Sequence, residues 1–171
     1  GVIFVVRAFN DESIPHPYGE VNFLNDVEQF VIESRLIDVQ IIEKRISNLS
    51  NYDKSLNKQD KENIDKKIDK LKELSNLIES GENFYSKKIS DDHRTLVDST
   101  FLMAKSPIML IINSDEGKKI DSINIDKAKL LLNQNIKVLQ IPLKFEEDLI
   151  EMNENEAKEF RNELEIENNI D

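Results

Sequence analysis

The sequence predicts an α/β fold, because three short apolar runs alternate with segments of helical periodicity. The runs are VIFVVRAF at 2–9, IMLIIN at 108–113 and VLQIPL at 138–143. A nearly continuous apolar run of this length is typical of a strand in a parallel sheet that is covered on both faces. The 171 residues include only four glycines and four prolines, which leaves little room for an all-β design with many tight turns. Helices should therefore supply most of the remaining structure.

Two helical patterns lead directly into the second and third runs. SDDHRTLVDSTFLMAK at 90–105 begins with Ser90 as a candidate N-cap and carries an apolar stripe, and IDKAKLLLNQN at 125–135 has the same character. The stripe of the first pattern comprises Leu96, Val97, Thr100, Phe101 and Ala104. The order helix, strand, helix, strand predicts a sheet with short connections.

A helical hairpin is predicted between the first strand and this alternating pattern. Two long segments repeat apolar residues at spacings of three and four, and the polar linker at 51–60 is too short for a third element. Gly81 is well placed to end the second arm. The seam of the first arm is Ile32, Leu36, Val39, Ile42, Ile46 and Leu49, and that of the second is Ile64, Ile68, Leu71, Leu74 and Ile78.

These patterns divide the chain into an α/β core and an inserted antiparallel coiled-coil hairpin. We expect the core to comprise 1–25 and 85–171, and the hairpin 26–84. The chain starts at Gly1, without methionine and already within a predicted strand, so we expect it to be part of a longer protein.

The composition excludes several classes of site. Without cysteine there can be no disulfide, thiolate zinc site or thiol nucleophile, which is typical of a reducing compartment. No apolar run approaches the roughly 20 residues that a membrane-spanning helix needs. We therefore expect a cytoplasmic protein with no membrane partner and, since no cluster of metal-ligating residues is evident, no metal site in this chain.

Positive charge is concentrated in the hairpin, although the formal net charge is −11. Between Lys44 and Lys72 there are nine Lys and Arg against five Asp and Glu. Six lysines at and beside the hairpin tip could contact phosphates of RNA or the ribosome: Lys54, Lys58, Lys61, Lys66, Lys67 and Lys70. The alternative is a solvated coiled-coil surface. Within the acidic stretch Glu146–Asp171, ENEAKEFRNELEIE at 154–167 is best interpreted as a solvated amphipathic helix with Phe160 and Leu164 on its inner face.

Asn113 and Glu116 follow the second predicted strand. The carboxyl end of a parallel strand is where ligands bind in open α/β sheets, and an asparagine with a carboxylate three residues later can hydrogen-bond a nucleotide base. A glutamate is one methylene longer than the aspartate of guanine-reading sites, which favours an altered base preference. The competing interpretation is a turn-forming Asn113 beside a solvated Glu116.

Several ordered segments resemble one family. VVRAFNDESIPHPYGEVNFLNDVE, the hairpin, FLMAKSPIMLIINSDE and IPLKFEEDL match in order and spacing the YchF family, the Obg-like P-loop ATPases. The resemblance implies a partial P-loop NTPase G-domain. The phosphate-binding loop, the magnesium ligands and the C-terminal TGS domain of such a protein would lie outside this chain, which alone should be inactive.

The resemblance also implies roles for individual residues. Asn113, Ser114 and Glu116 match the NxxE motif that accommodates adenine, and Lys144 matches the lysine of the family's SAK motif. Pro142 and Leu143 depart from that motif, which puts base contacts from this loop in doubt. The implied ligand is ATP, or GTP, with Mg²⁺.

His16 is the candidate catalytic residue. It lies in SIPHPYG, in the loop after the first strand, from which it could turn toward a nucleotide and orient or deprotonate the attacking water. The resemblance implicates a histidine at this position in hydrolysis. The alternative is a histidine in a surface loop.

Three functions remain open. The first is a YchF-like P-loop NTPase that binds and hydrolyses ATP, or GTP, in association with the ribosome. The second is a non-catalytic binding module whose basic hairpin docks RNA, the ribosome or a protein. A purely structural coiled coil is disfavoured by the three apolar strands.

Overall fold

The computed structural model describes residues 1–51, 56–81, 94–96, 99–100, 102–103, 106–132 and 136–163. The chain forms two compact units. The first comprises Gly1–Glu28 and Pro107–Asp171, and the second comprises Gln29–Ser106. No helix within the described ranges is long and apolar enough to cross a membrane.

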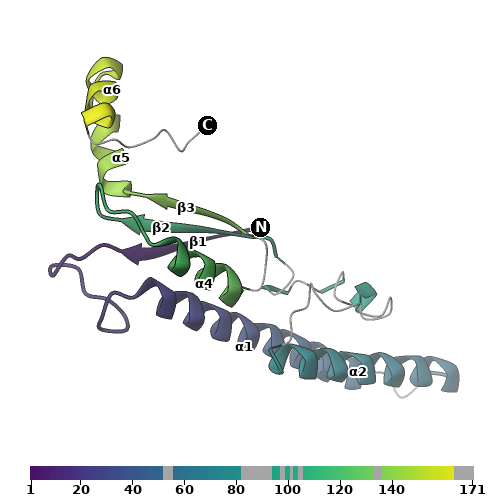
Figure 1. Ribbon diagram of the computed structural model, residues 1–171. Helices are drawn as coiled ribbons and strands as arrows, with labels where there is room; N and C mark the ends of the chain where they lie inside the picture. The colour runs from purple at the N-terminus through teal and green to yellow at the C-terminus, as the bar shows by residue number, and fades with distance from the viewer. Residues whose placement is uncertain are drawn as a thin grey trace. The chain divides into compact units, whose positions relative to one another are not determined.

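The first unit is built on a parallel sheet, as predicted. Its strands are β1 (Val2–Ala8), β2 (Ile108–Ser114) and β3 (Lys137–Ile141), in the order β1-β2-β3 (Figure 1). In the register of the sheet, Arg7 lies beside Asn113, and Asn113 lies beside Ile141. The carboxyl ends of all three strands therefore meet at one edge, which is where open α/β sheets place their ligands.

The two faces of the sheet are not equally covered. In β2, Leu110 and Ile112 are fully buried, whereas in β1 the side chains of Ile3 and Val5 are 66% and 48% exposed. The prediction that every strand is covered on both faces is therefore wrong for β1. An apolar run reports the hydrophobicity of a strand but not which elements pack on it, and none of the described elements covers this face of β1.

Three helices complete the first unit. They are α4 (Ser122–Leu132), α5 (Leu143–Ile150) and α6 (Glu154–Glu163) (Figure 1). Helix α4 begins three residues earlier than predicted, where Asp121 Oδ1 accepts a hydrogen bond of 3.0 Å from the N–H of Ile123. It buries Ala128 and Leu132.

Helix α5 takes up the end of the third apolar run, because β3 stops at Ile141 and Pro142 precedes the first helical residue. Its Phe145 is buried and stacks on Phe160 of α6, with ring centroids 6.2 Å apart. Phe160 is 44% exposed, so it covers Phe145 without being a core residue. Leu164 lies outside the described residues.

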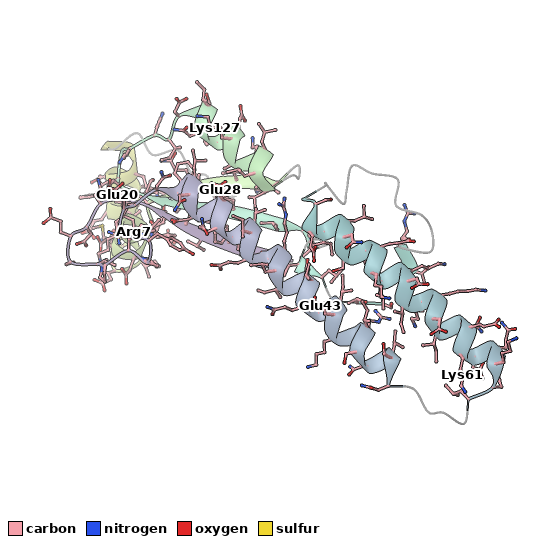
Figure 2. The ribbon with its side chains drawn as sticks, turned by 90° about the horizontal axis from the view of Figure 1, so that it is seen from below. Arg7, Glu20, Glu28, Glu43, Lys61 and Lys127 are labelled. Atoms are coloured by element: carbon pink, nitrogen blue, oxygen red, sulfur yellow. The ribbon has the colours of Figure 1, made fainter. Side chains whose placement is uncertain are left out.

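The second unit contains the predicted hairpin. The arms are α1 (Phe23–Ser50) and α2 (Lys58–Glu79), which lie side by side in Figures 1 and 2. The first turns of α1 belong to the first unit. Arg35, early in α1, donates a hydrogen bond of 3.4 Å to the carbonyl of Gly81, just after α2, so the arms are antiparallel. Gly81 has φ +72°, and a Cβ there would lie 2.7 Å from Arg35 Nη1. The positive φ favours glycine at this stop, whereas the Arg35 guanidinium ends a flexible side chain that a Cβ could displace.

The apolar seam of α2 matches the prediction, but that of α1 matches only in its second half. Ile68, Leu71, Leu74 and Ile78 of α2 are buried, as are Val39 and Ile42 of α1, with Ile46 and Leu49 packed against them. Ile32 and Leu36 are 43% and 57% exposed, so their assignment to the seam is wrong.

Polar contacts accompany the apolar seam on the buried side of α1. Asp38 is fully buried and accepts a hydrogen bond of 2.6 Å from the N–H of Met103, while Arg45 donates to the hydroxyls of Ser99 and Thr100. Leu96 and Leu102 complete the core of the unit. These contacts require α1 to face the 94–103 region, which its apolar periodicity alone does not reveal.

Of the helix predicted at 90–105, residues 94–96 are helical. Ser90, Val97, Phe101 and Ala104 lie outside the described residues.

Candidate functional site

Asn113 joins two elements at the carboxyl edge of the sheet. It is the penultimate residue of β2, and its Oδ1 accepts a hydrogen bond of 3.1 Å from the N–H of Leu143. Leu143 is the first residue of α5, and Pro142 at the N-cap position provides no side-chain hydrogen bond. The first N–H groups of a helix lack partners within the helix, so Asn113 supplies from a neighbouring strand the acceptor that an N-cap would otherwise provide.

The amide nitrogen of Asn113 remains available. Among the described residues it has no hydrogen-bond partner, while the side-chain oxygen is held by Leu143. The orientation of the amide is thereby fixed, with the acceptor turned toward α5 and the donor free to meet a ligand acceptor. Asn113 can therefore both cap a helix and bind a ligand, which the sequence presented as alternatives.

Ser114 can contact a ligand only through its backbone. It is 5% exposed, and its Oγ accepts a hydrogen bond of 2.9 Å from Gln140 Nε2. Gln140, in β3, was not singled out from the sequence. In the sequence, Gln140 is distinguished only as the one polar residue of the run VLQIPL.

Glu116 lies in the turn directly after β2 and is exposed. The turn is closed by an ion pair of 3.5 Å between Lys118 Nζ and Asp115 Oδ2, and Gly117 adopts φ +66°, a conformation that favours glycine. The carboxylate of Glu116 is thus presented to solvent one turn away from Asn113.

Lys144 lies in the first turn of α5, next to the residue that Asn113 caps. Its Nζ is 2.8 Å from Asp148 Oδ1 and 3.1 Å from Glu147 Oε2, and its side chain is 77% exposed. The hydrogen bond with Asp148, followed by that with Glu147, raises the pKa of Lys144 above its ordinary value. The ammonium group is charged at neutral pH and is paired along its own helix, so it would have to leave these carboxylates to contact a base.

His16 is held in place on both ring nitrogens. Nε2 lies 3.1 Å from Asp26 Oδ2 in the first turns of α1, and Nδ1 is 3.3 Å from the backbone nitrogen of Tyr18, which donates to it. Since Nδ1 accepts, the proton of the neutral ring is on Nε2 and is donated to Asp26. The His16 side chain is only 7% exposed, so the sequence-based picture of a histidine at the surface of a loop does not describe this state.

The contact with His16 involves only one of the two carboxylate oxygens of Asp26, Oδ2. Its other carboxylate oxygen, Oδ1, is buried and has no hydrogen-bond partner among the described residues. His16 is therefore the group that compensates the burial of this carboxylate.

Arg7 organises the loop that carries His16. Its guanidinium donates to three backbone carbonyls of the loop, those of Phe9 (3.0 Å), Asp11 (2.8 Å) and Ile14 (2.8 Å). It also lies over the Phe9 ring, 4.6 Å from the centroid. Arg7 is labelled in Figure 2. Arg7 and Asp26 thus fix the two ends of the loop.

Five of the six lysines predicted to contact phosphates lie on α2: Lys58, Lys61, Lys66, Lys67 and Lys70. Lys58 is almost fully exposed, and Lys66 and Lys67 are also exposed, while Lys61 and Lys70 are half-buried. Lys58 Nζ lies 3.9 Å from Glu62 Oε1, a long ion pair within the helix. Figure 2 shows Lys61 near the end of the hairpin at which α2 begins. Lys54 lies outside the described residues.

No group of three or more acidic or histidine side chains that could hold a metal ion occurs within the described ranges.

Comparison with known proteins gives one consistent family. No protein-family model matches the chain. It is 30% identical over 169 residues to the ribosome-binding ATPase YchF of Bacillus subtilis, covering 96% of this chain and 45% of that protein. It is 30% identical over 125 residues to Obg-like ATPase 1 of Saccharomyces cerevisiae, covering 70% of this chain and 31% of that protein.

A solved structure has the same fold. The YchF GTPase of Schizosaccharomyces pombe superposes with a TM-score of 0.73 at 22% sequence identity, covering 95% of this chain and 45% of that one. This chain thus spans less than half the length of these relatives.

Proposed function

Since this chain belongs to the YchF and Obg-like ATPase family, we propose that it supplies the base-recognition edge and the hairpin of a P-loop NTPase that binds ATP with Mg²⁺. The single observation that carries the proposal is the arrangement of Asn113. Its oxygen is committed to α5, and its amide N–H groups remain free at the edge where parallel sheets bind ligands.

The chemistry of the edge suits adenine. N7 of adenine is an acceptor, which the amide nitrogen of Asn113 can meet, and the exocyclic amino group is a donor, which needs a backbone carbonyl or a carboxylate. Backbone groups of the turn after Ser114 and the exposed carboxylate of Glu116 offer such acceptors. A site with glutamate in place of the guanine-reading aspartate should bind ATP at least as well as GTP.

Hydrolysis is assigned to His16. We propose that the histidine is released from Asp26 when nucleotide binds and that its imidazole then orients or deprotonates the attacking water. The state seen here, with both ring nitrogens engaged and the ring buried, corresponds to a resting arrangement in which His16 cannot act.

The hairpin is the second part of the proposal. The relative from B. subtilis is named a ribosome-binding ATPase, and the exposed lysines of α2 provide a surface for phosphates. We propose that this surface contacts the ribosome, which places the protein in the cytoplasm. A hairpin that docks a protein instead would bind without steep salt dependence.

Calorimetry with ATP and GTP on the full-length gene product tests the nucleotide assignment. We expect ATP to bind with equal or higher affinity than GTP. A clear preference for GTP would contradict the role given to Glu116, and the absence of binding by either nucleotide would contradict the proposed function as a whole.

A further inference from the structure

Gln140 connects three parts of the candidate base site. It is the penultimate residue of β3 and is half-buried. Its Oε1 accepts a hydrogen bond of 2.9 Å from the N–H of Ile120. Its Nε2 donates to Ser114 Oγ at 2.9 Å and also to the carbonyl of Lys118. Both donors and one acceptor site of the amide are therefore used within the protein.

The partners of Gln140 lie on either side of the turn that carries Glu116. Ser114 is the last residue of β2, while Lys118 and Ile120 lie in the segment between that turn and α4. Residues 115–121, which connect β2 to α4 and include the turn, form no strand or helix, and Gly117 among them has φ +66°, a conformation that other residues rarely adopt. One side chain of β3 thus holds the segment at its beginning and its end.

We propose that Gln140 is a positioning residue that determines which nucleotide base this edge accepts. The inference rests on the proposed function, because it assigns to Gln140 the placement of the backbone after Ser114 and of Glu116. Base discrimination depends on donors and acceptors held within about 0.5 Å of the productive geometry. An unsupported turn would meet adenine and guanine with more similar affinity.

The test replaces Gln140 by methionine in the full-length protein. Gln140→Met keeps a side chain of similar length and shape and removes all three hydrogen bonds. We expect the ratio of ATP affinity to GTP affinity to change by about fivefold, which corresponds to the loss of about one net hydrogen bond. A general loss of folded protein would scale both affinities and leave the ratio unchanged.

Two further variants separate positioning from general damage. Gln59→Met alters an exposed glutamine of α2 and should leave the ratio at its wild-type value. Ser114→Ala removes one of the three hydrogen bonds of Gln140 without changing β3 and should move the ratio in the same direction by a smaller factor.

Asn113→Ala, measured in parallel, distinguishes failure of this inference from failure of the proposed function. If Asn113→Ala weakens ATP binding while Gln140→Met and Ser114→Ala leave the ratio unchanged, the base site stands and the role of Gln140 is overturned. If Asn113→Ala also has no effect on nucleotide binding, the proposed function is overturned and the role of Gln140 with it.

Discussion

The sheet edge and the hairpin use side chains in opposite ways. At the edge, individual side-chain atoms make specific hydrogen bonds. Asn113 Oδ1 accepts from the N–H of Leu143, Gln140 Nε2 donates to Ser114 Oγ, and His16 Nε2 donates to Asp26 Oδ2. On the hairpin an apolar seam provides stability, and the ion pair of Lys58 with Glu62 is long and lies at the surface. A site that depends on geometry should be sensitive to single substitutions, whereas a charged surface responds to the sum of its charges.

The largest effect is expected where the hairpin depends on packing. Leu71 is fully buried in the hairpin core, so Leu71→Ala should lower the free energy of unfolding of that unit by about 2–5 kcal/mol. Leu36→Ala is the matched control, because Leu36 is 57% exposed and should cost less than about 0.5 kcal/mol. Urea unfolding followed by helical circular dichroism measures both, and equal losses would contradict the seam described here.

The second prediction concerns His16 at the sheet edge. If its imidazole acts on the attacking water, His16→Ala should lower turnover by about 100-fold with little change in nucleotide affinity. His16→Gln retains an N–H donor for Asp26 but has no imidazole.

Steady-state hydrolysis and nucleotide affinity of the two variants separate a catalytic role from a structural one. If His16 is catalytic, both variants should hydrolyse nucleotide slowly. Recovery of turnover in His16→Gln, or equal loss of binding and rate in His16→Ala, would demote His16 to a structural residue of the loop.

The third prediction tests whether the summed positive charge of the exposed α2 lysines determines ribosome binding. Changing Lys58, Lys66 and Lys67 together to glutamate should weaken ribosome binding by about tenfold or more and reduce the slope of log affinity against log salt. Lys127, Lys137 and Lys158 of the first unit, changed to glutamate, give the same change in net charge and should have little effect. Sedimentation with ribosomes at several salt concentrations measures both. Equal losses of ribosome affinity in the two variants would show that binding depends on the net charge of the protein and not on the α2 surface.

The contrast between the regions also explains what could be predicted from the sequence. The three parallel strands and the antiparallel hairpin follow from apolar periodicity, a local property that the structure confirms. The first half of the α1 seam could not be predicted, because Ile32 and Leu36 have the right spacing but lie close to the point where Arg35 bonds to Gly81, just past the end of α2. Tertiary hydrogen bonds of this kind leave no periodic signal.

The candidate site was predictable in its residues but not in its connections. The strand end and the family resemblance indicate Asn113, Glu116 and His16. The cap on Leu143, the amide of Gln140 and the contact between His16 and Asp26 join residues 30, 26 and 10 positions apart. Only the register of the sheet and the course of the loop bring these groups together. The roles given to Asn113, Glu116 and His16 remain predictions, as do those given to Ser114, Lys144 and the lysines.

The most direct test of the account is the comparison of Asn113→Asp with Asn113→Ala. Aspartate keeps an oxygen for the N–H of Leu143, and a carboxylate at a helix N-terminus is favourable, so Asn113→Asp should unfold at nearly the wild-type temperature. It lacks the amide donor, so its ATP affinity should fall by about tenfold, whereas Asn113→Ala should lose both stability and affinity. Wild-type ATP affinity in folded Asn113→Asp would contradict the claim that the amide nitrogen of Asn113 reads the base.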